Sequence, residues 1–344
     1  MSTSGKSSDF DSAIRRFESY HPNHLSGEVN MKRLVLVSGS SNLELSKRIA
    51  KYLDITLVNP GLVKFANGEV CCEVEKSVRG ADVFIIQSTS TPANDNLMEL
   101  LIVIDALKRA SAASITAVMP NYGYSRQDRK ISPRSPITAK LVANLISAAG
   151  ATRVITMDLH AGQIQGFFDI PFDNIYGSPV MVDYIRKNIS TDNAICVSPD
   201  SGGVERVSHY AKKLGLDIAM IDKRRTGRNV AKAMNIVGNI KGKDCILIDD
   251  MIDTAGTLVE ACRALKENGA TKVFAIATHG VFSNPAIERI AGCEALDRVV
   301  VTDTIPLSEE GKKVGRIHVV SITEVLAKAI HRTFNNDSVS SLFM

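Results

Sequence analysis

Short runs of aliphatic and β-branched residues alternate with longer amphipathic stretches along most of the chain. In the first half, strands are predicted at RLVLVS (33–38), VFIIQS (83–88), ITAVMP (115–120) and RVITMD (153–158). Helices are predicted between them, at NDNLMELLIVIDALKRASA and ITAKLVANLISAAG. This alternation is typical of repeated βαβ units, whose parallel strands are buried on both faces. It predicts an α/β fold, with a mainly parallel sheet flanked by helices.

The second half repeats this plan, although the sequence shows no convincing internal repeat. Further strands are predicted at AICVSP, DIAMID, DCILIDD, KVFAIATHG and RVVVTD, and most precede a helix. We place a boundary between two similar domains near DNIYGSPV, so that the domains comprise residues 31–177 and 178–344. Residues 1–30 are polar and precede the first strand signal, which predicts a flexible N-terminal extension.

Composition agrees with two aliphatic cores. The chain has 344 residues and is 44% apolar, but only 5% aromatic and without Trp. Its formal charge of +4 comes from short basic clusters, which favour small anionic ligands and do not indicate a nucleic-acid-binding tract. The six cysteines have no CxxC spacing, and we interpret them as buried thiols in a reducing compartment. No window has the ~20 apolar residues of a membrane span, so we expect a cytoplasmic protein without membrane contact.

The segment ILIDDMIDTAGT (246–257) carries the clearest chemical signal. Asp249 and Asp250 are predicted to end a strand, and a helix is predicted to begin near Gly256. The turn between them consists of Asp253, Thr254, Ala255, Gly256 and Thr257. Its small residues allow backbone N–H groups at a helix N-terminus to bind a phosphate. The paired acids are suited to sugar hydroxyls, so this segment predicts a sugar-phosphate site.

An alternative is that Asp253 and Thr254 merely cap the helix. That alternative leaves the adjacent acids unexplained, because their mutual repulsion requires a cation or a ligand to offset it.

Other polar residues also follow predicted strands, at the edge where ligands bind in such sheets. The loop PNYGYSRQDRK (120–130) contains Arg126 and Gln127 and is suited to a polyphosphate, although such a charge run can also be a solvated loop. His160 and Asp200 follow two further strands, and their alternatives are a structural histidine and a helix cap. The segment AMIDKRRTGRNV (219–230) predicts a cationic flap that closes over an anionic transition state.

Together these segments resemble the ribose-phosphate pyrophosphokinase family over residues 31–344. The resemblance rests on FANGEV, NDNLMELL, DALKRASA, YSRQDRK, PITAKL, MDLHAGQIQGFFDIP, SPDSGGVERV, IDKRR, IDDMIDTAGT and DSVSSLF, in that order. The sugar-phosphate loop is shared with phosphoribosyltransferases. The resemblance therefore implies two similar domains of the type I phosphoribosyltransferase fold.

The implied reaction is transfer of the β,γ-diphosphoryl group of MgATP to the anomeric hydroxyl of ribose 5-phosphate, which leaves AMP. By carry-over from the family, the ATP-binding residues are Phe65, Asn67, Gly68, Glu69, Arg126 and Gln127, and the ribose-5-phosphate-binding residues are Arg225, Asp249, Asp250, Asp253, Thr254, Ala255, Gly256 and Thr257. The implied magnesium positions are His160 and Asp200, and the implied catalytic residues are Lys223 and Arg225. Mg²⁺ prefers oxygen ligands, so a role of His160 through water or phosphate stays open.

The resemblance further implies a homo-oligomer, typically a hexamer, in which residues 65–69 reach the ATP site of a neighbouring subunit. The family's positions for regulatory phosphate and ADP correspond to Arg79, Arg109, Ser111, Ser338 and Ser340. Departures from the family's pattern include Asn67 for Asp, Ala255 for a frequent Gly, and the loop KISPRSP (130–136). The alternative function is a catalytically silent regulatory paralogue, which should have lost flap or metal-binding residues.

Overall fold

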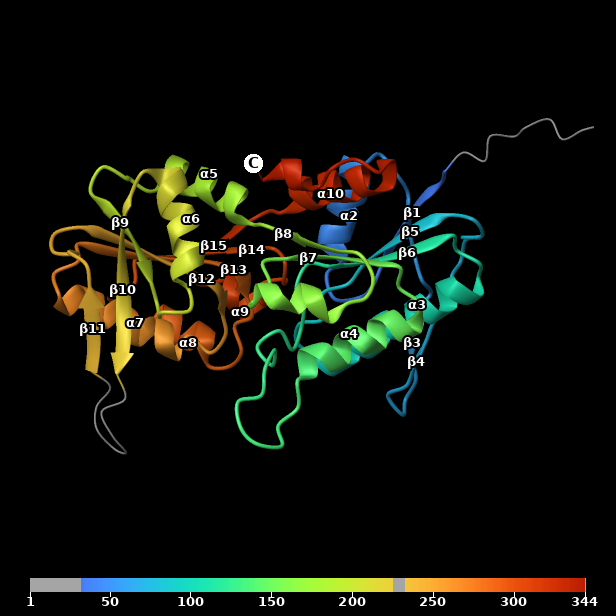
Figure 1. Cartoon of the computed structure of the whole chain (residues 1–344), viewed down its shortest axis with the longest axis horizontal. Helices are drawn as coiled ribbons and strands as arrows, with labels where there is room; N and C mark the ends of the chain where they lie inside the picture. Colours follow the sequence, from blue (N-terminus) through green and yellow to red (C-terminus); the bar gives the residue numbers. More distant parts are fainter. Residues whose placement is uncertain (1–31, 225–232, 344) are drawn as a thin grey trace, which may run out of the picture. The chain divides into compact units, whose positions relative to one another are not determined.

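The structure, a computed structural model, describes residues 32–224 and 233–343. Within this part, the first half contains a six-stranded parallel sheet (Figure 1). Its strands are, in spatial order, β2 (Leu57–Val58), β1 (Leu34–Ser38), β5 (Asp82–Ile86), β6 (Ser114–Met119), β7 (Arg153–Met157) and β8 (Phe172–Ile175). The four strands predicted in this half are confirmed as β1, β5, β6 and β7. The predicted extension at residues 1–30 lies outside the described residues.

The second half contains a seven-stranded sheet, counted over the same described ranges. Its strands are, in spatial order, β11 (Ala233–Val237), β10 (Asp217–Arg224), β9 (Ala194–Ser198), β12 (Asp244–Ile252), β13 (Lys272–Gly280), β14 (Arg298–Thr302) and β15 (Ile317–Val320). All neighbours are parallel except β10 and β11, which pair antiparallel at the edge. All five predicted strands of this half are present.

Helices cover both faces of each sheet (Figure 1). The first sheet packs on α3 (Ala93–Arg109) and α4 (Thr138–Ala149) on one face, and on α2 (Leu43–Tyr52) and α10 (Thr323–Asn335) on the other. The second packs on α7 (Gly256–Glu267) and α8 (Ala286–Ala291), and on α5 (Ser178–Asn188) and α6 (Val204–Leu214). Burial on both faces explains why strands such as AICVS lack a polar alternation.

The remaining elements are short. They are α9 (Glu309–Lys312), the 3₁₀ helices η1 (Gly162–Phe167) and η2 (Ser340–Leu342), and the antiparallel hairpin of β3 (Val63–Lys64) and β4 (Val70–Cys71). The hairpin was not predicted, because two-residue strands give no periodic signal.

The last helix packs against the first half of the chain. On α10, Leu326 and Ile330 share a buried apolar cluster with Leu45 and Ile49 of α2. Contacts join Leu34–Met344 into one compact unit. The division into domains at residue 177 stays a prediction, and the core of the first half includes a helix from the end of the chain.

The prediction that all six cysteines are buried is wrong at β4. Cys71 is exposed and Cys72 is partly exposed, because the hairpin stands outside the two large sheets. Cys196, Cys245, Cys262 and Cys293 are buried, as expected, and all six cysteines are free thiols. Among the described residues, no helix is both long enough and apolar enough to cross a membrane.

Candidate functional site

The turn between β12 and α7 lies at the carboxyl end of the second sheet. β12 continues to Ile252, two residues beyond the predicted end at Asp249 and Asp250, because Asp250 and Ile252 still alternate inward while Asp249 and Met251 are partly exposed. α7 begins at Gly256, as predicted, so its first N–H groups face the end of the sheet. This is the position at which a helix N-terminus binds an anion.

The capping alternative for this turn is wrong. The N-cap residue is Ala255, and none of the described side chains caps the first turn of α7. Asp253 is instead paired with Arg126, whose Nη2 lies 2.6 Å from Asp253 Oδ2. The pair joins the loop after β6 to the loop after β12, so the predicted polyphosphate and sugar-phosphate loops meet.

Ala255 has a φ of 57°, in the left-handed region. The family's pattern often has Gly at this position, and glycine adopts such a φ without the steric cost of a Cβ. A non-glycine residue in this region costs about 1–2 kcal/mol. The neighbouring Gly256 lies close to Arg289, since a Cβ there would lie 3.2 Å from Nη1 of Arg289 and the guanidinium would have to shift. Arg289 also donates to the carbonyl oxygen of Thr254 at 2.9 Å and thereby supports the turn.

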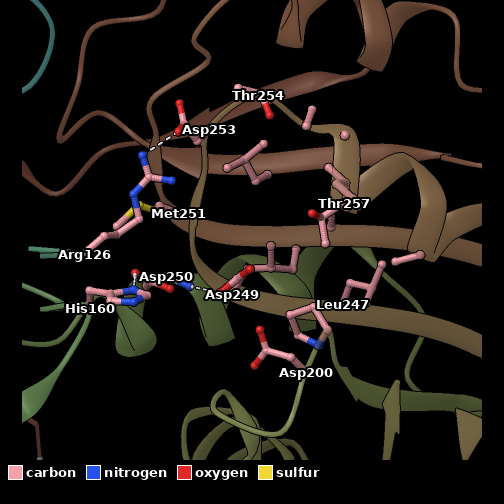
Figure 2. Close-up of a pocket in the computed structure, with 18 residues that line it drawn as sticks. Arg126, His160, Asp200, Leu247, Asp249, Asp250, Met251, Asp253, Thr254 and Thr257 are labelled. Atoms are coloured by element: carbon pink, nitrogen blue, oxygen red, sulfur yellow. Dashed lines mark hydrogen bonds and ion pairs between the residues drawn. The ribbon is translucent and has the colours of Figure 1, made fainter. Parts of the chain in front are cut away.

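These elements enclose a pocket of about 280 Å³. Its lining contains the residues that Figure 2 labels, namely Arg126, His160, Asp200, Leu247, Asp249, Asp250, Met251, Asp253, Thr254 and Thr257. Ala255 and Gly256 line it as well. Thus every described residue predicted to bind the sugar phosphate lines one pocket, together with both predicted magnesium positions and Arg126.

The acidic pair is contacted by a guanidinium and an imidazole of the protein itself. Asp250 has a side chain 4% exposed, and its Oδ2 lies 2.8 Å from His160 Nδ1. Its Oδ1 lies 3.2 Å from Nη1 of Arg206, on α6, and the same nitrogen is 3.7 Å from Asp249 Oδ1. The repulsion inferred from the sequence is therefore offset inside the fold.

The pKa values of the two carboxyl groups are shifted in opposite directions. Burial alone would raise the pKa of Asp250, but the hydrogen bond with His160 and the charge of Arg206 outweigh it and hold that pKa below its ordinary value. Burial, together with the charge on Asp250, raises the pKa of Asp249. The hydrogen bond with Asp250 raises the pKa of His160. Asp250 is therefore the ionised carboxylate that His160 and Arg206 contact inside the fold. Asp249 is the more exposed acid of the two.

Asp200 is fixed by the turn that precedes α6. Its Oδ1 accepts hydrogen bonds from the backbone N–H groups of Gly202 and Gly203, both at 3.0 Å. Gly203 is the N-cap residue, so Asp200 holds the turn and does not cap the helix in the expected way. Its Oδ2 has no hydrogen-bond partner within the described ranges, which leaves this oxygen available to a ligand.

The donor set fits magnesium only in combination with a substrate. In the part of the chain that the structure describes, no cluster of three or more His, Cys, Asp or Glu side chains could hold a metal ion alone. Mg²⁺ in phosphate-transfer sites is held by one or two carboxylates together with substrate phosphates and waters. Asp200 supplies such a carboxylate, and the hydrogen bond of His160 through Nδ1 leaves Nε2 free to face a ligand or its water.

The other predicted residues lie elsewhere. Oε1 of Gln127 accepts a hydrogen bond from the hydroxyl of Thr138, and Gln127 does not line the pocket. Residues 65–69 form the tip of the β3–β4 hairpin, where Asn67 Oδ1 accepts from the N–H of Glu69, and they do not line it either. The backbone of Lys223 pairs with Met234 across β10 and β11. Arg225 lies outside the described residues.

The predicted regulatory positions fall in two groups. Arg79 is next to Gly80, whose N–H donates to the carbonyl oxygen of Ser111, and Arg109 is paired with Asp105 on α3. Ser338 and Ser340 bond each other at 2.9 Å, beside η2.

Sequence reasoning missed Arg206 and Arg289. Both lie on helices among other charged residues, and their roles depend on which strand and turn each helix packs beside. The only local signal for Arg206 is that it follows Asp200 within the segment SPDSGGVERV.

The fold and this pocket define an α/β protein with an acidic pocket at the carboxyl end of a mainly parallel sheet, beside the N-terminus of α7. Comparisons with known proteins identify the family. Residues 34–150 match the family model described as the N-terminal domain of ribose phosphate pyrophosphokinase. Residues 226–344 match that of the phosphoribosyl synthetase-associated domain.

Curated relatives named ribose-phosphate pyrophosphokinase cover nearly the whole chain. The protein from Campylobacter jejuni is 57% identical, over 91% of this chain and 100% of the relative. That from Haemophilus influenzae is 54% identical, with the same coverage. The crystal structure of phosphoribosylpyrophosphate synthetase from Mycobacterium smegmatis matches with a TM-score of 0.84 at 44% identity, and covers 89% of this chain and 100% of that one. The chain therefore belongs to the ribose-phosphate pyrophosphokinase family, and the predictions of its fold and of an enzyme of the transferase class are confirmed.

Proposed function

We propose that the chain is a ribose-phosphate diphosphokinase. The anomeric hydroxyl of ribose 5-phosphate attacks the β-phosphorus of ATP, the bond from that phosphorus to the α,β-bridging oxygen breaks, and AMP leaves. The hydroxyl proton is lost, and the product is 5-phosphoribosyl 1-pyrophosphate, a precursor for nucleotide, His and Trp biosynthesis. The observation that carries the proposal is the single pocket that joins the Asp253–Thr257 turn to His160, Asp200 and Arg126.

In this proposal the turn binds the 5-phosphate of the sugar. Its support is the N-terminus of α7, which presents backbone N–H groups beside Thr254 and Thr257 at the pocket. Asp249 then accepts hydrogen bonds from ribose hydroxyls. It is the more exposed acid of the pair, whereas Asp250 is engaged by His160 and Arg206.

The ATP phosphates are proposed to lie between Arg126 and the two magnesium positions. Bound magnesium would neutralise charge on the diphosphoryl group and orient it. Arg126 offers a planar guanidinium to phosphate oxygens, and its existing bond to Asp253 ties the two substrate loops together. Asp200 and His160 are supported as magnesium positions by the free Oδ2 and Nε2 atoms described above.

Lys223 and Arg225 are proposed to stabilise the charge on the transferred group. Phosphoryl-type transfer depends mostly on positioning and on electrostatic stabilisation of the transition state. The proposal is supported within the described residues by the place of Lys223 near the end of β10, which pairs antiparallel with the edge strand β11.

The assembly is proposed to be a homohexamer in the cytoplasm, with each ATP site completed by Phe65, Asn67, Gly68 and Glu69 of a neighbouring subunit. Its support within the chain is that Phe65 is 52% exposed on a projecting hairpin. Sedimentation velocity at several concentrations tests the assembly. Regulation by phosphate and ADP through Arg79, Arg109, Ser111, Ser338 and Ser340 is proposed on the family pattern alone.

The deciding experiment measures AMP formation from ATP with Mg²⁺ and ribose 5-phosphate, with each substrate omitted in turn and with or without inorganic phosphate. AMP that appears only with the sugar phosphate is the expected result. No AMP from folded protein would overturn the proposal. A silent regulatory paralogue is not favoured, because Lys223, Arg225, His160 and Asp200 are all present.

A further inference from the structure

A polar network lies directly behind the turn that carries His160. Asp158 follows β7 with a φ of 38°, a conformation that few residues other than glycine adopt. Its Oδ2 accepts a hydrogen bond from the backbone N–H of Gly177 at 2.9 Å and another from the hydroxyl of Thr278 at 2.5 Å. Thr278 lies on β13, so the second sheet holds the turn at the end of the first sheet.

His279, the next residue on β13, binds the same turn through the backbone. It is 2% exposed, and its Nε2 lies 3.1 Å from the carbonyl oxygen of Met157 and 3.3 Å from that of Asp158. Carbonyl oxygens only accept, so we assign the proton to Nε2. Nδ1 lies 2.9 Å from the hydroxyl oxygen of Thr304 and can accept from it. Both ring nitrogens of neutral His279 are therefore satisfied without solvent.

The polar network and the pocket are linked at two places. His279 pairs with Met251 of β12, and the preceding residue on β12 is Asp250. Asp250 bonds His160, which lies two residues beyond Asp158. Asp158 is thus hydrogen-bonded to β13, and His160 is hydrogen-bonded to the adjacent strand β12. The conformation of the Asp158 turn therefore affects the position of His160 relative to Asp250.

We infer that Asp158 and His279 are positioning residues for the reaction, and that they fix the turn so that His160 faces Asp250 and the pocket. The inference rests on the proposed function, because it concerns the magnesium side of that site. Neither residue belongs to the pocket lining found among the described residues, so they act through His160. Groups that orient a metal-binding histidine typically contribute about 10–100-fold to activity or metal affinity, and a displacement of about 1 Å can cost about 10²-fold in rate.

Thr278→Val is the most selective test, because it removes one hydroxyl from Asp158 and keeps the side-chain shape. Its matched control is Thr156→Val. Thr156 is a buried threonine on β7, two residues before Asp158, but its hydroxyl donates to the carbonyl oxygen of Met119 on β6 at 2.7 Å and not to Asp158. We expect Thr278→Val to lower kcat about 10-fold and to raise the Mg²⁺ concentration for half-maximal activity. Its KM for ribose 5-phosphate should stay within about twofold, because the sugar turn is untouched. The control should match wild type in all three quantities.

Amide hydrogen exchange gives a readout that needs neither metal nor turnover. In the free protein, the segment 157–162 should exchange faster in Thr278→Val than in Thr156→Val. A second pair of variants tests His279. Gln places an amide N–H near the position of Nε2, so His279→Gln should retain more activity than His279→Leu at equal protein stability.

The outcomes separate the two proposals. A wild-type chain that forms no AMP would overturn the proposed function and, with it, this inference. An active wild type whose Thr278→Val variant equals Thr156→Val in kcat and magnesium dependence would overturn the inference alone. Equal exchange rates of segment 157–162 in the two variants would also overturn it.

Discussion

The contact of Arg206 with the acidic pair gives a prediction whose size follows from the structure. We consider Arg206→Met, which keeps the aliphatic stem of the side chain and removes the guanidinium. Asp250 would then be a nearly buried carboxylate whose remaining side-chain partner in this network is His160. We expect the free energy of unfolding to fall by about 3 kcal/mol at pH 7.

This value reflects the electrostatic attraction between Arg206 and Asp250, reduced by the desolvation of Arg206. At an effective dielectric of about 20, a separation of 3.2 Å corresponds to an attraction of about 5 kcal/mol between Arg206 and Asp250. The attraction to Asp249 is screened, because that side chain is 42% exposed. Desolvation of Arg206, which is 24% exposed, opposes part of the gain. Breaking one side of a buried pair typically costs about 3–5 kcal/mol, and we take the lower end because His160 remains.

The effect should depend on pH in a defined direction. The folded-state pKa of Asp250 is lowered, so its contribution to stability is present above the unfolded value of about 3.9 and is lost as the pH falls through the folded value. The pKa of His160 is raised, so its pairing contributes most below about pH 6.5 and is lost as the pH rises through its folded value. His160 is therefore better able to replace Arg206 at low pH. The loss caused by Arg206→Met should shrink between pH 7.5 and pH 5.

The assay is urea unfolding followed by circular dichroism and by tyrosine fluorescence, which is suitable because the chain has no Trp. Coincident transitions from the two probes would justify a two-state free energy. A double-mutant cycle with Asp250→Asn should give a coupling of about 2 kcal/mol or more. The reasoning is refuted if the coupling is near zero, or if the loss is the same at pH 5 and pH 7.5.

Three further predictions concern the site. Lys223→Ala should lower kcat by about 10²-fold with a modest change in KM, as loss of transition-state stabilisation requires; a raised KM with an intact kcat in steady-state kinetics would contradict the flap assignment. Asp249→Ala should raise the KM for ribose 5-phosphate more than that for ATP, and an unchanged sugar KM would place the sugar elsewhere. Ala255→Val should lower the free energy of unfolding by about 1–2 kcal/mol, because a β-branched side chain is poorly accommodated at this positive φ; equal thermal stability would show that the turn relaxes.

The architecture was predictable because helices cover both faces of each sheet. Continuous apolar runs such as AICVS and RVITM then predict buried parallel strands directly. The end of β12 was not predictable, since adjacent acids indicate a strand end unless the partners of Asp250 are known. Those partners, His160 and Arg206, come from segments 90 and 44 residues away in sequence. The hairpin β3–β4 was missed because its strands are two residues each.

The candidate site was predictable where its residues follow strands at once. His160, Asp200 and the turn after β12 follow this rule, and they line one pocket. The roles of Arg206 and Arg289 depend on helix packing, which the sequence does not encode locally. The resemblance to a family supplied the roles of Lys223, Arg225 and the hairpin tip, which the pocket geometry of one chain does not supply.

The packing of α10 on α2 has a consequence for synthesis on the ribosome. The first half of the chain emerges before Leu326 and Ile330, so the side of Leu45 and Ile49 that packs on α10 stays uncovered until those residues are made. The face of α2 that packs on α10 is therefore covered only after almost the whole chain has been synthesised. The first half must be protected from aggregation during this interval, and a nascent chain that stops before residue 323 cannot complete its first core.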